Sequence, residues 1–162
     1  MLHNPFPDEP DFGPVGTISF FVPGIPSPGG SKKFMGIGRR TGRAIIIDAG
    51  GEKTKAWRSL VAAFAYEHRP AQPFRQPLRV DFLFSMPRPK SHFFTGRRAH
   101  ELRPEAPIWH TNTPDVLKLA RSTEDAMTGI IYDDDSATVM LRALKRYGSN
   151  PGCQVVIQPC SE

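Results

Sequence analysis

The sequence predicts an α+β fold in which a small mixed β-sheet packs against two main helices, in the approximate order ββαβαββ. Runs of alternating or β-branched apolar residues predict the strands, and two segments with apolar residues three and four positions apart predict the helices. The 162 residues suit one domain, because 39% of them are hydrophobic and supply one modest core. The 17 prolines and 14 glycines predict long loops around that core.

The first third of the chain predicts a tail, a strand and a cationic segment. Residues 1–14 contain four prolines and are expected to form a flexible tail, which leaves 15–162 as the folded domain. Residues 17–22 are β-branched and aromatic, which predicts a first strand. Residues 23–44 carry five basic residues and no acid, and we expect a cationic loop or hairpin whose second strand is 45–47.

The middle of the chain alternates helix, strand and loop. Residues 52–68 predict an amphipathic helix that ends before Pro70, and residues 78–86 alternate apolar and other residues as a strand with one buried face does. Residues 87–107 predict a second basic loop that also contains aromatic residues. Its paired Phe93 and Phe94 are interpreted as covering an edge of the core in preference to stacking on nucleic-acid bases.

A second helix is expected to begin at Thr113-Pro114-Asp115, with a hydroxyl cap, a proline in the first turn and an acid at the positive end of the helix dipole. Gly129 is expected to end it, and the following 137–147 and 153–158 predict a C-terminal hairpin. One face of this helix is apolar and the other is charged. The apolar face is predicted to hold Val116, Leu119, Ala120, Thr123, Ala126 and Met127, and the polar face Asp115, Lys118, Arg121, Ser122 and Asp125.

Acidic residues flank this helix, with Asp115 at its start and Asp133–Asp135 beyond its end. Carboxylate oxygens are the ligands that Mg²⁺ prefers, and clustered acids in a basic protein suit metal-assisted cleavage of phosphodiesters. A straight helix would separate the two acidic sites by more than ~20 Å, so they meet only if the chain after Gly129 doubles back along it. The alternative is structural: Asp115 satisfies the helix dipole, and the acidic run is a solvated turn.

The charge balance predicts an anionic partner, since the net charge is +5 and the isoelectric point is near 9.5. Basic loops beside an acidic site indicate a protein that contacts the phosphate backbone of DNA. Basic loops also occur on proteins that are merely soluble, so this signal is not specific. The predicted DNA-contacting residues are Lys32, Lys33, Arg39, Arg40, Arg97, Arg98, Lys118 and Lys145.

The spacing of glycines, histidines and cysteines argues against several other kinds of site. Residues 24–31 are spaced like a phosphate-binding loop, but Gly30 stands where its lysine belongs. The five histidines do not fall at helical metal-ligand spacing, and only His110 lies near Asp115. Cys153 and Cys160 match neither a disulfide framework nor a zinc site, which predicts a reducing cytoplasm. The chain has no apolar run of the length that crosses a membrane, so no membrane partner is expected.

Three segments carry a resemblance to a known family: 114–121, 125–129 and 132–136, which read PDVLKLAR, DAMTG and YDDDS. With them the chain resembles the RusA family of Holliday junction resolvases of phage and prophage origin, and residues 22–26 and 57–58 are similar to the opening of that family. The resemblance implies a homodimeric endonuclease of mixed α/β fold. It also implies a requirement for Mg²⁺, for which Mn²⁺ is expected to substitute.

The resemblance assigns roles to single positions. Asp115 matches the family's first acidic ligand, Asp135 matches the acid before the small residue, and Asp134 is its neighbour. Arg121 falls where the family has an active-site lysine, which keeps the positive charge but not the compact ammonium. Leu117 falls on the family's second acid and does not bind a metal. Glu124 lies on the same side of the helix, but about 10 Å farther along it, and does not replace that acid in place.

The function expected from these features is paired, Mg²⁺-dependent cleavage of four-way DNA junctions in a bacterial or phage-infected cytoplasm. The expected metal ligands are Asp115, Asp134 and Asp135, and Arg121 completes the expected catalytic set. The alternative is a non-catalytic protein that binds junction or duplex DNA and has lost its metal ligand at Leu117. A third class, a structural or interaction protein without a role on nucleic acid, predicts no salt-sensitive binding of DNA.

Overall fold

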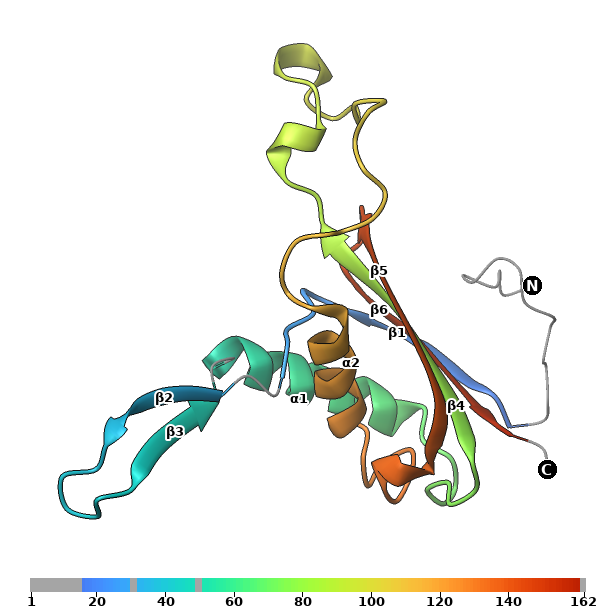
Figure 1. Ribbon diagram of the computed structural model, residues 1–162. Coiled ribbons are helices and arrows are strands. Elements are labelled where there is room, and N and C mark those ends of the chain that lie inside the picture. Colours follow the sequence, from blue (N-terminus) through green and yellow to red (C-terminus); the bar gives the residue numbers. More distant parts are fainter. Residues whose placement is uncertain (1–15, 30–31, 49–50, 161–162) are drawn as a thin grey trace.

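The computed structural model describes residues 16–29, 32–48 and 51–160, and within them the expected α+β fold is confirmed. A mixed four-stranded sheet lies beside two helices, as Figure 1 shows. The tail expected at residues 1–14 lies outside the described residues. None of the helices in the described ranges has the apolar length that a membrane-spanning segment requires.

The main sheet contains β1 (Ile18–Pro23), β4 (Leu78–Pro87), β5 (Thr138–Gly148) and β6 (Gly152–Pro159), in the order β1-β6-β4-β5. β4 pairs parallel with β5 and antiparallel with β6, which pairs antiparallel with β1. The predicted C-terminal hairpin is therefore wrong, because β4 lies between β5 and β6. β4 is buried along almost its whole length, and a neighbour on each edge satisfies its backbone groups where water has no access.

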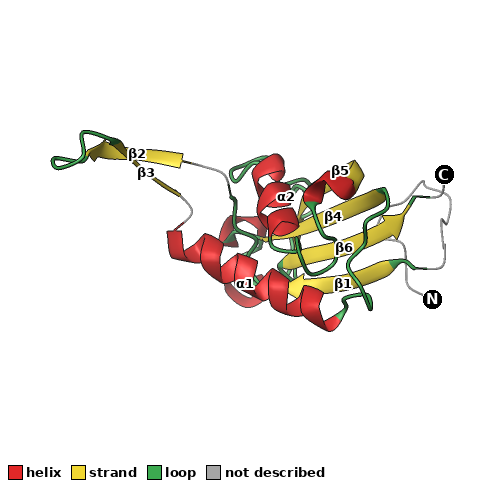
Figure 2. Ribbon diagram, turned by 90° about the horizontal axis from the view of Figure 1, so that it is seen from below, coloured by secondary structure: helices red, strands yellow, loops and turns green. Residues whose placement is uncertain are grey.

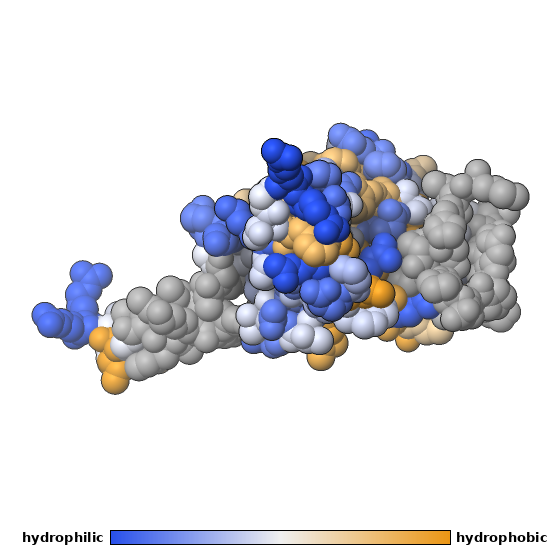
Figure 3. Space-filling view, turned by 90° about the horizontal axis from the view of Figure 1, so that it is seen from above, coloured by the Kyte–Doolittle hydropathy of each residue, from blue (hydrophilic) through white to orange (hydrophobic). Residues whose placement is uncertain are grey.

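β2 (Lys32–Ile37) and β3 (Ala44–Asp48) form a separate antiparallel hairpin that extends away from the sheet and helices (Figure 2). A hairpin was expected here, but β2 was not predicted as a strand. The register shifts between Phe34 and Gly36, and Gly36 has φ +133°, so a glycine bulge interrupts the strand pattern. The tip of the hairpin presents hydrophilic groups (Figure 3), and Arg39 and Arg40 are exposed.

Helices α1 (Gly51–Glu67) and α2 (Val116–Asp125) agree with the two helices that the apolar spacing predicts. The indole N–H of Trp57 on α1 donates a buried hydrogen bond of 3.1 Å to the Thr123 hydroxyl on α2, which joins the two helices. Most of the predicted apolar face of α2 packs in or against the core, but Ser122, expected on its polar face, is fully buried. The loop before the hairpin packs closely there, since a Cβ on Gly29 would lie 3.1 Å from the Cβ of Ser122.

Candidate active site at the two ends of helix α2

Asp115, and not Thr113, is the residue that precedes the first turn of α2. Its backbone is extended, and its carbonyl oxygen accepts a hydrogen bond of 3.1 Å from the Leu119 N–H. The prediction of Thr113 as the cap is wrong, because the first hydrogen bond of the helix is accepted by the Asp115 carbonyl, two residues later. The Lys145 ammonium, from β5, donates hydrogen bonds of 2.6 Å to the carbonyl oxygens of Asn112 and Pro114. The helix also ends at Asp125, earlier than Gly129 suggested.

The Asp115 carboxylate is exposed and lies near two ammonium groups. It makes no side-chain capping bond, so its oxygens are not consumed by the helix backbone. The Lys118 Nζ lies 3.6 Å from its Oδ2. Burial lowers the pKa of the Lys145 ammonium, and the nearby Asp115 charge opposes that effect. The N-terminal end of α2 therefore combines one carboxylate with two cations, an arrangement suited to a phosphate group.

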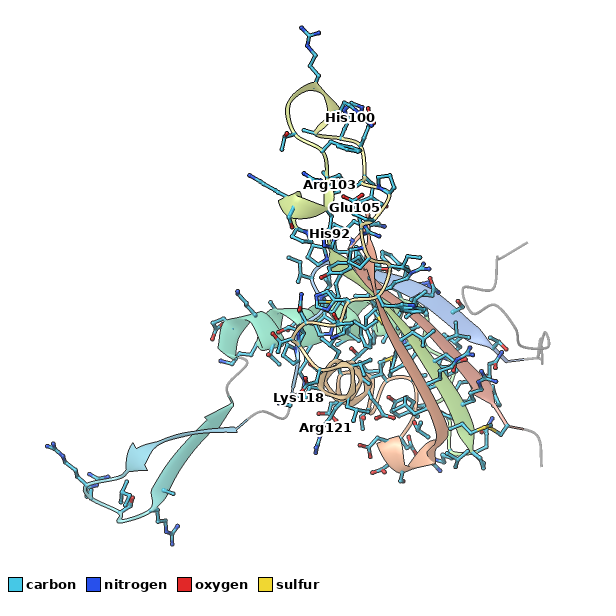
Figure 4. The ribbon with its side chains drawn as sticks, turned by 45° about the horizontal axis from the view of Figure 1, so that its top comes forward. His92, His100, Arg103, Glu105, Lys118 and Arg121 are labelled. Carbon is cyan, nitrogen blue, oxygen red and sulfur yellow. The ribbon has the colours of Figure 1, made fainter. Side chains whose placement is uncertain are left out.

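Leu117 and Arg121 project from the outer side of α2. Leu117 is 72% exposed, which is unusual for a leucine on a helix that packs in a core. Arg121 is exposed and forms no ion pair with any described residue, and Figure 4 shows it and Lys118 directed away from the sheet. Leu117 lies seven residues before Glu124, so the two share one side of the helix. The exposed side of α2 thus carries the positions at which the resemblance places catalytic groups.

The C-terminal end of α2 carries the acidic run in a short turn before β5. Asp134 caps the turn Asp135–Ala137, because its Oδ1 accepts a hydrogen bond of 2.9 Å from the Ser136 N–H. Hydrogen bonds from Ser136 lower the pKa of the Asp134 carboxyl. Asp133 forms an ion pair with Arg75. Of the three acids, Asp135 is the one whose carboxylate has neither of these structural tasks.

Glu124 adds a further carboxyl to this end, and sequence reasoning did not count it as part of the site. Burial raises the pKa of the Glu124 carboxyl, and the nearby charges of Asp135 and Asp125 raise it further. The Tyr132 hydroxyl donates a hydrogen bond of 2.8 Å to the Glu124 carbonyl oxygen. Asp125 lies 3.8 Å from Arg58 of α1. This end of the helix therefore gathers several carboxyl groups, of which Asp125 and Asp133 already lie beside arginines.

The two acidic sites do not meet within one protomer. After Gly129 the chain does double back, because β5 leads from one end of α2 to the other (Figure 1). Asp135 lies at the start of β5 near Glu124, whereas Lys145 near the other end of β5 reaches the Asp115 loop. The ten residues of α2 span about 15 Å. Carboxylates suit a hard cation, but the described ranges contain no group of three His, Cys, Asp or Glu side chains placed to hold one.

A cavity of about 780 Å³ opens beside the Asp115 end of α2. It is lined mostly by apolar side chains, from residues 25–28, from one side of α1 between Lys53 and Leu60, from Met86, and from Thr113–Asp115 and Lys118. Trp57 forms part of the wall, while Asp115, Lys118 and Lys53 supply the charged groups. Its volume is that of a small-ligand pocket, so the N-terminal end of α2 has a concave surface next to its charges.

The second basic loop forms an arm beyond the end of β4, where Figure 4 labels His100 and Arg103. The guanidinium of Arg98 lies 3.9 Å from the Phe94 ring centroid and 2.7 Å from the Glu101 carboxylate. The interpretation of Phe93 and Phe94 as a core edge is wrong, because neither packs against the described core. Phe94 instead organises the arm and holds Arg98, while the neighbouring Arg97 is exposed.

His110 packs against an aromatic ring and is not placed as a metal ligand. Its ring centroid lies 4.7 Å from that of Tyr147, and its Nδ1 is buried with no hydrogen-bond partner in the described part of the chain. Burial and the positive charge of Lys145 lower the pKa of the His110 imidazole, which favours its neutral form. Cys153 and Cys160 are both free, in agreement with the absence of a disulfide framework.

Comparison with known proteins places this chain in a family. A model of the endodeoxyribonuclease RusA family matches residues 36–158, a range that contains both helices and both acidic sites. Lys32 and Lys33 precede the matched range. The uncharacterized protein YqaN of Bacillus subtilis (strain 168) is 31% identical over 109 residues, which cover 67% of this chain and 76% of YqaN.

Proposed function

This chain belongs to the RusA family of endodeoxyribonucleases, and we propose that it resolves four-way DNA junctions by paired cleavage of phosphodiesters. The observation that carries the proposal is the exposure of Asp115 and Asp135, the two acids that the family pattern marks, at the ends of one helix within the matched range. Paired cuts in two strands need two sites related by symmetry, so the active form is a homodimer. Its setting is the cytoplasm of a bacterial or phage-infected cell.

The proposed metal ligands are Asp115, Asp134 and Asp135, and Mg²⁺ or Mn²⁺ is the proposed cofactor. A hard divalent ion supplies an activated water and neutralises charge in reactions of this class. Asp135 is the strongest candidate at its end of the helix, because Asp134 already caps a turn. Asp135 and Asp134 are both exposed in the turn before β5, which leaves their carboxylates accessible to a cation.

The cations at the other end of α2 have separate proposed roles. Lys145 holds the loop before Asp115 by its two hydrogen bonds to carbonyl oxygens, and so positions that carboxylate. Lys118 and Arg121 are exposed and bind the phosphate to be cut. An arginine remains charged at every relevant pH, so Arg121 stabilises developing negative charge but transfers no proton.

The hairpin and the arm supply the proposed contacts to the arms of the junction. Both project from the sheet and helices (Figure 1) and carry exposed arginines, so they reach phosphates at a distance from the helix. Replacing Arg39 and Arg40 by alanine should lower the slope of log affinity against log salt by about 0.9 for each lost phosphate contact. Filter binding over a range of salt concentrations measures it, and an unchanged slope contradicts a role for the hairpin.

Cleavage of a synthetic four-way junction tests the proposal directly. With Mg²⁺ or Mn²⁺ the purified protein should produce symmetric nicks, and with a chelator it should produce none. A linear duplex of the same sequence is the control and should be cut much more slowly. Cleavage that a chelator leaves unchanged contradicts the metal assignment, and equal cleavage of junction and duplex contradicts structure selectivity.

One observation favours a second candidate function, that of a junction-binding protein without catalysis. Leu117 occupies the position of the family's second acid and is exposed, so no core packing requires a leucine there. Tight, salt-sensitive binding of the junction with no cleavage in either metal would establish this candidate. Cleavage that depends on Asp135 would exclude it.

A further inference from the structure

The cavity beside the N-terminal end of α2 is formed by three segments that lie far apart in the sequence. The loop 25–28, one side of α1 and the residues that begin α2 each contribute to its wall. The Thr54 hydroxyl on α1 donates a hydrogen bond of 2.8 Å to the Pro28 carbonyl oxygen. The Gly29 N–H donates a hydrogen bond of 3.0 Å to the Lys118 carbonyl oxygen on α2. Because these bonds tie the loop to both helices, the cavity is a fixed feature of the packed fold.

Most of the wall is apolar, and one side chain in it is aromatic. Trp57 is 3% exposed, and its hydrogen bond to the Thr123 hydroxyl holds the indole in one orientation. Ile25 on the loop is 65% exposed and lines the same cavity. Enzymes that take a nucleobase out of the stack hold it between aromatic and apolar side chains. The apolar side chains of this wall, apart from its prolines, are Ile25, Ala56, Trp57, Leu60 and Met86.

The charged side chains of the cavity favour an anionic ligand. Lys53, Asp115 and Lys118 line it, and all three are exposed. The Lys118 Nζ lies 3.6 Å from the Asp115 Oδ2, so Lys53 supplies the positive charge that remains after this pairing. A flat ring with apolar faces joined to a phosphate therefore matches the cavity in both shape and charge, and this is the chemistry of a nucleotide.

We propose that the cavity binds one nucleobase that has left the stack of the DNA next to the phosphate to be cut, with Lys53 and Lys118 on the flanking phosphates. This inference rests on the proposed function and deepens it, because it names the part of the junction that the site recognises. The position of the base follows from Asp115, which is both a wall residue of the cavity and a proposed metal ligand.

Binding of an unstacked base supplies a physical reason for selectivity between a junction and a linear duplex. Taking a base out of a duplex costs pairing and stacking energy, and the cost is lowest where the base is poorly paired or poorly stacked. Base pairs at the branch point of a four-way junction can lack a stacked neighbour on one side. A contact that forms only after a base has left the stack is therefore made more readily at the branch point than within a linear duplex.

The fluorescence of 2-aminopurine in a four-way junction tests the proposal without any cleavage. This base analogue is dim inside stacked DNA, so it is placed in turn at each nucleotide around the branch point, and the protein is added in the presence of a chelator. Fluorescence at one of these positions should rise severalfold with the parent protein and should stay low in a linear duplex. The absence of a rise at every position, or an equal rise in the duplex, overturns the proposal.

Two tryptophan substitutions on α1 connect that signal to the cavity. Ala56 is exposed and lines the cavity, so Ala56→Trp fills the space without disturbing the core. Ala63 is exposed on the same helix away from the cavity, which makes Ala63→Trp the matched control. The rise in fluorescence should be lost in Ala56→Trp and kept in Ala63→Trp. Equal signals from the two folded variants overturn the assignment of the cavity.

A mismatched base pair at the responding position gives a second measurement. A mismatch lowers the cost of taking the base out of the stack, so it should tighten junction binding by the parent protein and by Ala63→Trp about fivefold or more. Binding by Ala56→Trp should not respond to the mismatch. An equal response in Ala56→Trp and Ala63→Trp overturns the proposal, even if both bind the matched junction well.

Lys53→Met and Lys55→Met test the phosphate contact. Lys55 is also exposed on α1, but it pairs with Glu52 and does not line the cavity. Lys53→Met should lower the slope of log affinity against log salt by about 0.7–0.9, the value for one phosphate contact, and Lys55→Met should leave it unchanged. If Ala56→Trp fails to fold, this pair of variants decides, and equal slopes overturn the proposal.

Other occupants of the cavity would give different results. Free dAMP has the same chemistry as a nucleotide of the strand, and it should compete only at millimolar concentration because it lacks the other contacts of the DNA. Binding of free dAMP at micromolar concentration, with the 2-aminopurine signal unchanged, would assign the cavity to a soluble nucleotide and overturn the proposal. A changed oligomeric state of Ala56→Trp without DNA, with its signal intact, would assign the cavity to a second copy and also overturn it. If the parent protein gives the signal and does not cut with Mg²⁺, the proposed cleavage fails and the inference about the cavity holds.

Discussion

The two ends of α2 differ in charge although one short helix connects them. At the N-terminal end a single carboxylate, Asp115, lies near Lys118 and Lys145. At the C-terminal end carboxylates accumulate, and the pKa of Glu124 is raised by burial and by its acidic neighbours. Cleavage of a phosphodiester needs both carboxylates for a metal and cations for the phosphate. The N-terminal end has the cations but one carboxylate, and the C-terminal end has the carboxylates, so the proposed activity requires contributions from both ends.

The same strand shapes both ends. The turn that leads into β5 presents the acidic run, and Lys145 near the end of β5 holds the loop before Asp115. A change at one end of β5 therefore tests a different component of the site from a change at the other end. We expect substitutions at the two ends to lower the cleavage rate by different amounts.

The largest effect is expected from Asp135→Asn, which removes a ligand charge without changing shape. The cleavage rate should fall by about two to three orders of magnitude, with junction binding retained. The cleavage rate of Asp115→Asn should fall by the same factor if both acids serve one site. Asp133→Asn is the matched control, because Asp133 is paired with Arg75, and it should cost much less. Single-turnover nicking measures all three rates. A full loss in Asp133→Asn, or none in Asp135→Asn, contradicts the assignment.

A smaller effect is expected from Lys145→Met, which removes the two hydrogen bonds to the Asn112 and Pro114 carbonyls. Hydrogen bonds from a charged group are worth about 1.5–3 kcal/mol each where they are protected from water, and partial exposure places the loss at about 1–2 kcal/mol in total. Cleavage should fall roughly tenfold because Asp115 loses its anchor. Denaturant unfolding and nicking rates measure both effects, with the exposed Arg146→Met as control. Equal behaviour of the two variants would remove Lys145 from the site.

Leu117→Asp adds a second acid to the N-terminal end of α2, where Asp115 is the single carboxylate, and so tests the difference between the two ends. The half-saturating Mg²⁺ concentration should fall several-fold and the cleavage rate should rise, because a hard cation gains a ligand. Leu117→Asn is the control for polarity without charge. A level or falling rate would show that another carboxylate already fills that place, and an unchanged Mg²⁺ requirement in a folded variant would show that position 117 is not beside the metal.

The smallest effect is expected from Glu124→Gln and concerns stability. The raised pKa of Glu124 means that the folded state binds this proton more tightly than the unfolded state. The associated stability is present below the unfolded pKa and is lost as pH rises through the folded pKa. Glu124→Gln should therefore be slightly more stable than the parent at neutral pH and equal to it in acid. Thermal unfolding at both pH values measures this, and a variant that is less stable at neutral pH contradicts it.

Local sequence patterns predicted many of the helices and strands. Apolar spacing along α1 and alternation along β4 were sufficient to find both elements, because each buries a periodic set of side chains. The alternation did not show that β4 also buries Asp81 and Leu83 on its other face. β2 was missed because a bulge at Gly36 breaks its period. The two C-terminal strands were predicted, but their pairing partners were not. The sequence of a strand specifies which of its faces is buried, and it says little about which strand pairs with each edge.

The positions of Asp115 and Asp133–Asp135 on either side of α2 were determined by the sequence alone, through turn and capping signals that act within a few residues. Three features were decided only by the tertiary structure. Lys145, 31 residues from Pro114, holds the loop that sets the start of α2. β4 separates β5 from β6 and leaves β5 at an edge of the sheet, and Leu117 is exposed although it lies on a helix that packs in the core. The reason is physical. Hydrogen bonds and electrostatic interactions between segments far apart in the sequence depend on which surfaces the packed core brings together, and no local periodicity of the sequence encodes this arrangement.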